Sequence, residues 1–313
     1  MSSRPARPHV DIGGLLIVTG ADENFMPLLR GLVESLQQWG RLQRGQLACL
    51  DVGLGPASRD WLREYTDTIV SPEWDIPLDA KLATAKPHLR AITARPFLPK
   101  YFPGHETYMW MDADTWLQEW YPIDWYVAAA AERKLAIAPQ VDRAYRHSQG
   151  VLNWRMERLR PYCGPTAMAL LNTEQYLNAG VFALRADAPH WARWADGFRR
   201  GVDACQGRQC CDQAALNYTV WTERLPVHPL PALCNWTCHL AIPAFLPATG
   251  RFHEPFVPHQ SIGVMHLTGG TKDYSFDFRD DQGRTVRSDL RFSRERNPRA
   301  AAGAQPAGQR GET

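Results

Sequence analysis

The sequence has no apolar run long enough to cross a bilayer and no large excess of charge of either sign. Its 313 residues carry a formal net charge of +2, with 44% hydrophobic and 22% charged residues. A membrane-spanning helix needs about 20 consecutive apolar residues, so no transmembrane segment is expected. So small a net charge does not indicate a nucleic-acid-binding surface. The composition is typical of a globular protein with one large or two ordinary domains.

The sequence also lacks a signal-peptide pattern and the regular cysteine spacing of a disulfide framework or zinc finger. No apolar stretch of the signal-peptide type follows residues 1–9. The number of cysteines is odd, and Cys210, Cys211, Cys234 and Cys238 do not have zinc-finger spacing. We therefore expect reduced thiols and a cytoplasmic location, with peripheral contact to a membrane left open.

Apolar runs of strand length alternate with amphipathic runs of helix length, which predicts an α/β fold with a mostly parallel sheet flanked by helices. The expected strands cover residues 13–19, 46–52, 68–71, 108–111, 135–138, 178–184 and 262–267. The expected helices cover residues 26–39, 58–65, 81–94, 124–133, 190–202 and 212–221.

Two segments have no clear period. Residues 140–177 are rich in Arg, Tyr and Trp and are a candidate acceptor-facing segment, although their role is not defined by the sequence. Prolines are dense in residues 223–262, where we expect loops and short antiparallel strands in the C-terminal half. We predict a flexible lead-in at 1–11, a folded domain at 12–292 and a disordered tail at 293–313, because the tail has no large apolar residue.

The most informative stretch is residues 108–116, YMWMDADTW, in which an apolar strand ends in Asp112 and Asp114. Two carboxylates just beyond a strand can converge on one point and suit Mg²⁺ or Mn²⁺, ions that usually bridge to phosphates. Open α/β sheets bind ligands at the carboxyl ends of their strands. Acidic pairs also occur in solvated turns, so this motif alone does not decide between a metal site and a turn.

Other expected strand ends carry Asp22, Asn24, Asn178 and His266. Because parallel strands end at the same edge of a sheet, we expect these residues to lie near the acidic pair. Histidine and two carboxylates are a suitable set for Mn²⁺. Each residue also has a purely structural alternative: Asp22 or Asn24 as a helix cap, and His266 as a hydrogen-bonded core residue.

Several blocks, in this order along the chain, resemble the retaining glycosyltransferases of family 8. The blocks are residues 21–25 (ADENF), Arg95, residues 112–114 (DAD), 178–181 (NAGV), 212–217 (DQAALN) and 266–272 (HLTGGTK). The resemblance implies a GT-A fold and retaining transfer of a sugar from a UDP-sugar to an acceptor hydroxyl. The acceptor is unknown: a glycan, a lipid-linked sugar or a small molecule. One departure is Asp273-Tyr274, where many members have Pro-Trp.

The resemblance also implies roles for individual residues. The metal, Mn²⁺ with Mg²⁺ as the alternative, would be held by Asp112, Asp114 and His266. The nucleotide would contact Thr19, Ala21, Asp22, Asn24, Phe25, Ala113, Gly269 and Lys272. The donor sugar and diphosphate would contact Arg95, Asn178, Ala179, Gly180, Asp212 and Gln213. Asp212 and Gln213 would lie at the anomeric centre as the catalytic residues, although Asp212 could equally be a helix cap. Because no residue has the marks of an activated nucleophile, we favour attack from the leaving-group face over double displacement.

Two other functions fit parts of the sequence. Asp112 to Thr115 also matches the D-x-D-x-[TV] motif of haloacid-dehalogenase-type phosphatases, with Asp112 as nucleophile and Asp114 as acid/base. That motif normally opens its fold, whereas about a hundred residues precede it here. The second alternative is a non-catalytic sugar-nucleotide-binding protein, because a fold by itself does not establish activity.

Overall fold

The computed structural model describes residues 10–247, 249–279 and 283–295. Of the predicted lead-in and tail, residues 1–9 and 296–313 lie outside this described part. The helices are α1 (Met26–Gln37), α2 (Pro56–Arg63), α3 (Ala80–Ala85), α4 (Leu89–Ala94), α5 (Leu98–Tyr101), α6 (Tyr121–Ala130), α7 (Gln149–Cys163), α8 (Ala167–Thr173), α9 (His190–Ala204) and α10 (Asp212–Thr222). The 3₁₀ turns are η1 (Glu23–Phe25), η2 (Arg44–Gln46), η3 (Arg95–Phe97), η4 (Gly164–Thr166), η5 (Ala232–Cys234) and η6 (Gly269–Asp273).

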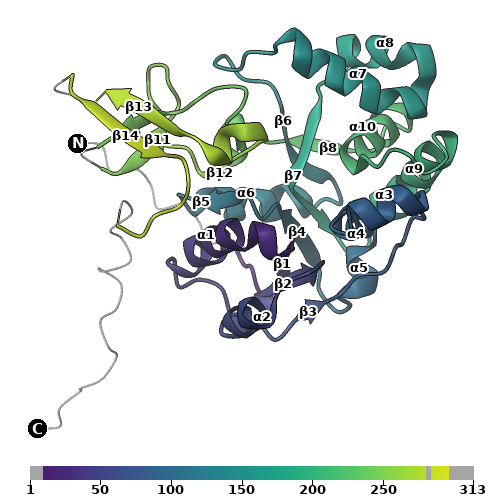
Figure 1. Cartoon of the computed structure of the whole chain (residues 1–313), viewed down its shortest axis with the longest axis horizontal. Helices are drawn as coiled ribbons and strands as arrows, with labels where there is room; N and C mark the ends of the chain where they lie inside the picture. The colour runs from purple at the N-terminus through teal and green to yellow at the C-terminus, as the bar shows by residue number, and fades with distance from the viewer. Residues whose placement is uncertain (1–9, 248, 280–282, 296–313) are drawn as a thin grey trace, which may run out of the picture.

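A seven-stranded sheet in the order β3-β2-β1-β4-β7-β6-β8 forms the centre of the molecule (Figure 1). Its strands are β1 (Leu15–Ala21), β2 (Leu47–Asp51), β3 (Ile69–Val70), β4 (Thr107–Met111), β6 (Leu135–Pro139), β7 (Leu177–Arg185) and β8 (Val227–Pro229). The strands β3, β2, β1 and β4 are parallel, whereas β7 is antiparallel to both β4 and β6. The mostly parallel α/β sheet predicted from the sequence is thus confirmed.

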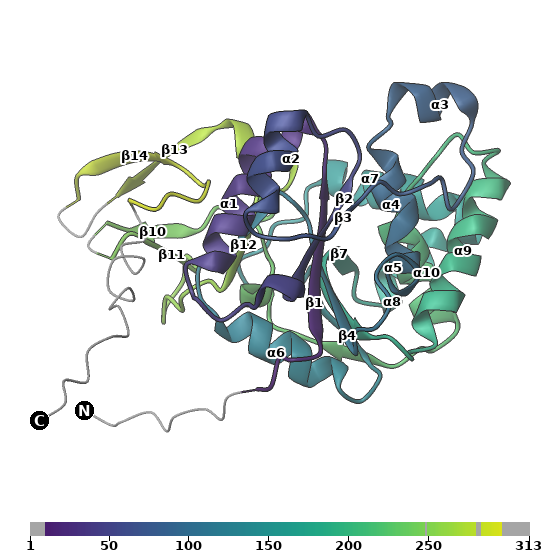
Figure 2. The ribbon, with the colours of Figure 1, turned by 90° about the horizontal axis from the view of Figure 1, so that it is seen from below.

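Helices cover both faces of this sheet, because side chains along a strand point alternately to the two sides. In β4, Met109 and Met111 belong to the core beneath α1 and α6, while Tyr108 and Trp110 belong to the core beneath α4, α9 and α10. Figure 2 shows α1 and α2 on one side of the sheet and α9 and α10 on the other. Both faces of the sheet are therefore buried, which explains the continuous apolar runs in the sequence.

The C-terminal half adds smaller sheets beside the central one. A three-stranded sheet has the order β5-β12-β9, and the other two are hairpins. The strands are β5 (Thr115–Leu117), β9 (Trp236–Thr237), β10 (Ala244–Leu246), β11 (Arg251–His253), β12 (Val264–His266), β13 (Ser275–Arg279) and β14 (Thr285–Asp289). Within 223–262, the expected antiparallel pairing holds for β10 and β11, but β8 and β9 are parallel to their neighbours.

Two sequence expectations need correction, and one segment without a clear period is now defined. The helix predicted at 81–94 is two helices, α3 and α4, because Pro87 cannot continue the hydrogen-bonding pattern. Residues 140–177, which show no clear period in the sequence, contain two helices, α7 and α8, and α7 packs against α8, α9 and α10. Asn178 lies at the beginning of β7, not at the end of a parallel strand; it still lies at the same edge of the sheet as the acidic pair, because an antiparallel strand begins where its parallel neighbours end.

Candidate active site

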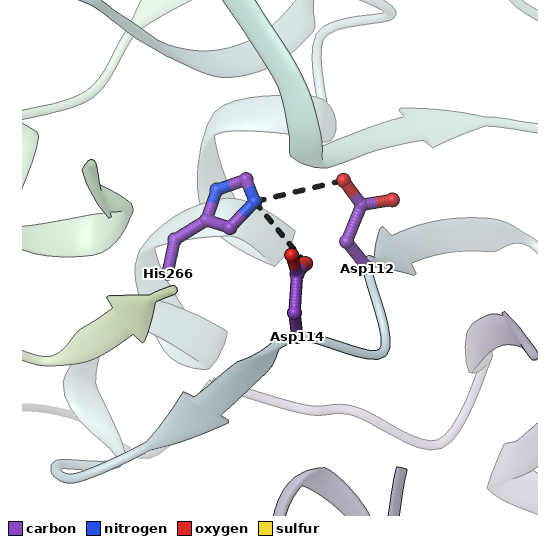
Figure 3. Close-up of side chains that lie close together, drawn as sticks. All are labelled: Asp112, Asp114 and His266. Carbon is purple, nitrogen blue, oxygen red and sulfur yellow. Dashed lines mark ion pairs between the residues drawn. The ribbon is translucent and has the colours of Figure 1, made fainter. Parts of the chain in front are cut away.

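Asp112, Asp114 and His266 form a cluster at the carboxyl end of β4. Their ligand atoms all lie within 4.8 Å of one another. The Nε2 atom of His266 is 3.4 Å from Oδ1 of Asp114 and 3.7 Å from Oδ2 of Asp112 (Figure 3). The chain turns after Asp112 into β5, and β5 pairs with β12 so that Thr115 lies opposite His266. This pairing brings a histidine more than 150 residues away in sequence to the acidic pair.

Each carboxylate of the cluster has one oxygen fixed by a neighbour and the other directed at His266. Oδ1 of Asp112 accepts hydrogen bonds from Nε1 of Trp110, at 2.8 Å, and from the guanidinium of Arg95. Oδ2 of Asp114 accepts a hydrogen bond from Nζ of Lys272 at 2.6 Å. Oδ2 of Asp112, Oδ1 of Asp114 and Nε2 of His266 remain as possible metal ligands. Two carboxylate oxygens and an imidazole nitrogen are a set that fits Mn²⁺ or Mg²⁺.

The imidazole of His266 is oriented by two asparagines. Its Nδ1 lies 2.9 Å from Oδ1 of Asn235, and Nδ2 of Asn235 donates to Oδ1 of Asn178 at 3.0 Å. Because the Asn235 oxygen can only accept, Nδ1 donates and Nε2 faces the carboxylates. A second hydrogen bond of this kind is how proteins fix the tautomer of a metal-binding histidine.

Gly180 leaves the space in which the cluster sits. A Cβ atom at this position would lie 2.2 Å from Cε1 of His266 and 2.8 Å from Oδ2 of Asp112. Any side chain there would displace a candidate metal ligand, so close approach of the backbone accounts for glycine in the NAGV block.

Arg95 connects the cluster to Asp212. Its guanidinium is buried, stacks on the ring of Trp110 at 4.5 Å and donates from Nη1 to Oδ2 of Asp212 at 2.9 Å. Its Nη2 donates to Asp112. Burial disfavours the charged guanidinium, but the carboxylates of Asp112 and Asp212 outweigh burial and raise the pKa of Arg95.

The two acidic residues on either side of the site have opposite pKa shifts. Burial raises the pKa of Asp212, and the charge of Arg95 only partly opposes that rise. Burial also disfavours ionised Asp114, but the adjacent His266 and Lys272 outweigh burial and lower its pKa to about 2. Asp114 is therefore held as a carboxylate, as a metal ligand must be.

The hypothesis that Asp212 caps a helix is not supported. The residue before α10 is Cys211, and Asp212 is the first residue of the helix, with its side chain directed to Arg95. Gln213, next along, accepts a hydrogen bond from the backbone N–H of Ala179 at 2.9 Å. Asn217 accepts from the N–H of Leu177 at 2.7 Å. The DQAALN block thus fixes α10 against the NAGV strand.

Two pockets meet at Asp112. One, of about 190 Å³, is lined by the predicted nucleotide residues Ala21, Asp22, Phe25 and Ala113, together with Arg95 and both metal-cluster carboxylates. The other, of about 590 Å³, is lined by residues that include Asn178, Gln213, His266 and Gly269. Small-molecule sites in proteins are usually concave pockets of this kind, so both are candidate ligand sites.

Three predicted nucleotide residues do not line either pocket. Thr19 is fully buried in β1, Asn24 is exposed in η1, and Lys272 pairs with Asp114. Asp22 caps η1 by accepting a hydrogen bond from the N–H of Phe25 at 3.1 Å, while it also lines the smaller pocket. Both hypotheses for Asp22 are therefore compatible with its position.

The sequence analysis missed Trp110 and Asn235, which hold Asp112 and His266. Trp110 lies in the strand that was recognised, but its indole N–H gave no signal separate from core packing. Asn235 lies in a proline-rich segment, and its partners are 31 and 57 residues away. No local pattern could have found it.

Comparison with known proteins reveals the fold but no close relative. No family model matches the chain, and no curated protein matches it in sequence. The structure of the galactosyltransferase LgtC with donor and acceptor sugar analogues is similar over 82% of this chain and 88% of that one, with 18% identity and a TM-score of 0.50.

More distant similarities have TM-scores below 0.5. One is the bifunctional glycosyltransferase WbbM, with 12% identity over 82% of this chain and 46% of that one and a TM-score of 0.48. Another is mouse xyloside xylosyltransferase 1, with 13% identity over 80% of this chain and 96% of that one and a TM-score of 0.44. The LgtC similarity confirms the fold predicted from the motifs: the chain has a GT-A glycosyltransferase fold.

Proposed function

We propose that the protein is a retaining glycosyltransferase that moves a sugar from a UDP-sugar to an acceptor hydroxyl with Mn²⁺ held by Asp112, Asp114 and His266. One observation carries this proposal. The three candidate ligands lie where two pockets meet, with their donor atoms directed at one point. Mg²⁺ is the alternative ion, because its oxygen preference also fits the two carboxylates.

The chemical problem in such a transfer is the negative charge that grows on the diphosphate as the glycosidic bond breaks. A bound divalent ion supplies Lewis-acid stabilisation of that charge. We assign Lys272, whose Nζ lies 2.6 Å from Oδ2 of Asp114 beside the metal cluster, to a phosphate oxygen. Arg95 is already bound by two carboxylates, so we assign it to positioning Asp112 and Asp212.

The smaller pocket supports a nucleotide site. It is lined by Ala21, Ala113 and the exposed Phe25, and Nζ of Lys272 lies 5.0 Å from the Phe25 ring centroid. An apolar, shallow surface next to a cation suits a base and ribose followed by a diphosphate. We infer that the UDP part lies here and that the sugar extends into the larger pocket.

Asp212 and Gln213 are the residues we assign to the sugar. Asp212 is buried, with one oxygen bound to Arg95, so it is suited to stabilise positive charge on the sugar ring rather than to move as a nucleophile. This supports attack by the acceptor from the face that the diphosphate leaves, with retention of configuration. We also propose a reducing, cytoplasmic environment, which agrees with seven unpaired cysteines.

The alternatives make different predictions. The GT-A fold gives no support to the phosphatase hypothesis, in which Asp112 would be phosphorylated. A non-catalytic binding protein would bind a UDP-sugar without turning it over. Calorimetry of a UDP-sugar panel tests the proposal. We expect at least one donor to bind, and we expect this binding to require Mn²⁺ or Mg²⁺ and to be lost in Asp114→Asn. Binding that is independent of metal, or absent from the whole panel, would contradict it.

A further inference from the structure

The larger pocket is lined by a buried, positively charged side chain that has no role in the proposed chemistry. Arg155, on α7, lines this pocket with only 5% of its surface exposed. Nη2 donates to Oε1 of Gln140 at 2.6 Å, and the guanidinium stacks on the ring of Tyr176 at 4.7 Å. Within the part of the chain that the structure describes, Arg155 has no other hydrogen bond and no ion pair.

A buried guanidinium without a carboxylate is costly. Arg95 shows the usual solution, since two carboxylates offset its burial. Arg155 has only a neutral amide and a ring face, and burial lowers its pKa. An arginine has five N–H donors in a planar fork, so most of its hydrogen-bonding capacity is left for a ligand in the pocket.

The surroundings of Arg155 are also favourable to an anion. Ser148, Gly150 and Val151 line the same pocket, so the N-terminal end of α7, with its partial positive charge, borders the cavity. Among the described lining residues the sole carboxylate is Asp112, which is bound by Arg95 and Trp110 and belongs to the metal cluster.

Trp154 supplies a surface for a sugar ring in this pocket. It directly precedes Arg155, lines the cavity and is 42% exposed, with the Arg158 guanidinium over its ring at 5.8 Å from the centroid. An exposed indole face is a common platform for the apolar face of a sugar, so the pocket combines a stacking surface with a cation one residue away.

We propose that this pocket binds a sugar that carries an anionic group, a carboxylate or a phosphate, and that Arg155 pairs with that group. The inference rests on the proposed function for the assignment of a sugar, and it narrows the substrate class. Arginine pairs with carboxylate and phosphate through two parallel hydrogen bonds, which gives both affinity and selectivity against neutral sugars.

The test is a binding comparison on the full chain in the presence of Mn²⁺. Ligand-observed NMR would measure the affinities of methyl glucuronide, glucose 6-phosphate and methyl glucoside, with UDP present. A second arm would compare UDP-glucuronate with UDP-glucose by calorimetry. We expect at least one anionic compound to bind about tenfold more tightly than its neutral counterpart. Preference in the glycoside arm assigns the anionic group to the acceptor, and preference in the nucleotide arm assigns it to the donor.

Variants separate Arg155 from general electrostatics. Arg155→Gln should abolish the preference without changing UDP affinity, and Arg155→Lys should retain part of it. Arg160→Gln is the matched control: it makes the same charge change on the same helix, at an exposed position outside this pocket. It should leave the preference intact.

Two results would overturn the inference. One is equal binding of anionic and neutral compounds by the wild-type protein, which needs no variant to fold. The other is an unchanged preference in folded Arg155→Gln. The outcome is separable from the proposed function. Anion preference without UDP or Mn²⁺ binding would support the Arg155 site and contradict the proposed transferase. Binding of UDP and Mn²⁺ without anion preference would contradict the Arg155 site and agree with the proposed transferase.

Discussion

Arg95 and Asp212 form an ion pair in the interior of the protein, with Nη1 of Arg95 2.9 Å from Oδ2 of Asp212 and each side chain only 7% exposed. The same guanidinium donates to Asp112. One cation is therefore shared between the candidate metal cluster and the residue assigned to the sugar. The position of Asp212 relative to the metal ligands depends on Arg95.

Arg95→Gln should lower the free energy of unfolding by about 3–5 kcal/mol, because it leaves the buried carboxylate of Asp212 and the partly buried carboxylate of Asp112 without their counter-ion. Chemical denaturation in the absence of metal measures this. Arg44→Gln is the control, since Arg44 pairs with Asp67 at the surface, where both side chains are more than half exposed. It should hardly move the unfolding midpoint. Equal effects of the two substitutions would show that the Arg95 pair is not the buried support inferred here.

Asp212→Asn should lower kcat by roughly a hundredfold or more, the scale on which a preorganised electrostatic contact is lost. Burial already raises the pKa of Asp212, so a neutral side chain of the same shape fits the site, while the charge beside the sugar disappears. UDP affinity should barely change. Steady-state kinetics and UDP titration check both, with the melting temperature as the control for folding. An unchanged kcat in the folded variant would leave Asp212 with a structural role.

Gly180→Ala should weaken Mn²⁺ binding by about tenfold or more, which corresponds to roughly 1.4 kcal/mol. The added methyl group would lie 2.2 Å from His266 and force a ligand to move. Gly45→Ala is the control, because nothing lies within 4 Å of a Cβ there. Metal titration by calorimetry measures the effect. If Gly180→Ala binds Mn²⁺ like the control, the metal does not sit against this strand.

The stability of the protein should fall between pH 7 and pH 5 partly because of His190. Burial lowers the pKa of this imidazole to about 4, although its hydrogen bond to the Pro226 carbonyl opposes the shift. Nδ1 is buried without a partner, so the charged form is not accommodated. The unfolded chain, with an ordinary pKa near 6.5, takes up a proton in this range and the folded chain does not, so stability is lost as pH falls.

His190→Gln should remove this contribution, which amounts to about 2 kcal/mol between pH 7 and pH 5. Denaturant unfolding of both proteins at the two pH values measures it as a difference. A wild-type protein and a variant that lose stability in parallel would mean that His190 is protonated in the folded state.

The candidate site could be predicted from sequence where a residue follows directly from a strand. Asp112, Asp114 and His266 each lie at the end of an apolar run, so their chemistry and location were visible. Their convergence has a different cause from the one expected. His266 belongs to a separate three-stranded sheet and meets Asp114 through the pairing of β12 with β5, and a sequence does not show which strands pair.

The burial of individual polar side chains also could not be predicted from the sequence. Arg155 lies in a segment without clear periodicity, and nothing in the sequence distinguishes it from Arg158 and Arg160, the less buried arginines of the same helix. Its position over Tyr176 and beside Gln140 is set by how α7 packs on α9 and α10. The predicted domain limits at residues 12 and 292 stay predictions.

The central claim is that a divalent ion at Asp112, Asp114 and His266 enables cleavage of a UDP-sugar. The most direct test is release of UDP from a donor panel by the wild-type protein and by Asp114→Asn, with Mn²⁺ and with a chelator. We predict release from at least one donor with Mn²⁺, none with the chelator, and a rate at least about a hundredfold lower in the folded variant. Release that continues with the chelator, or at the wild-type rate in Asp114→Asn, would contradict the account.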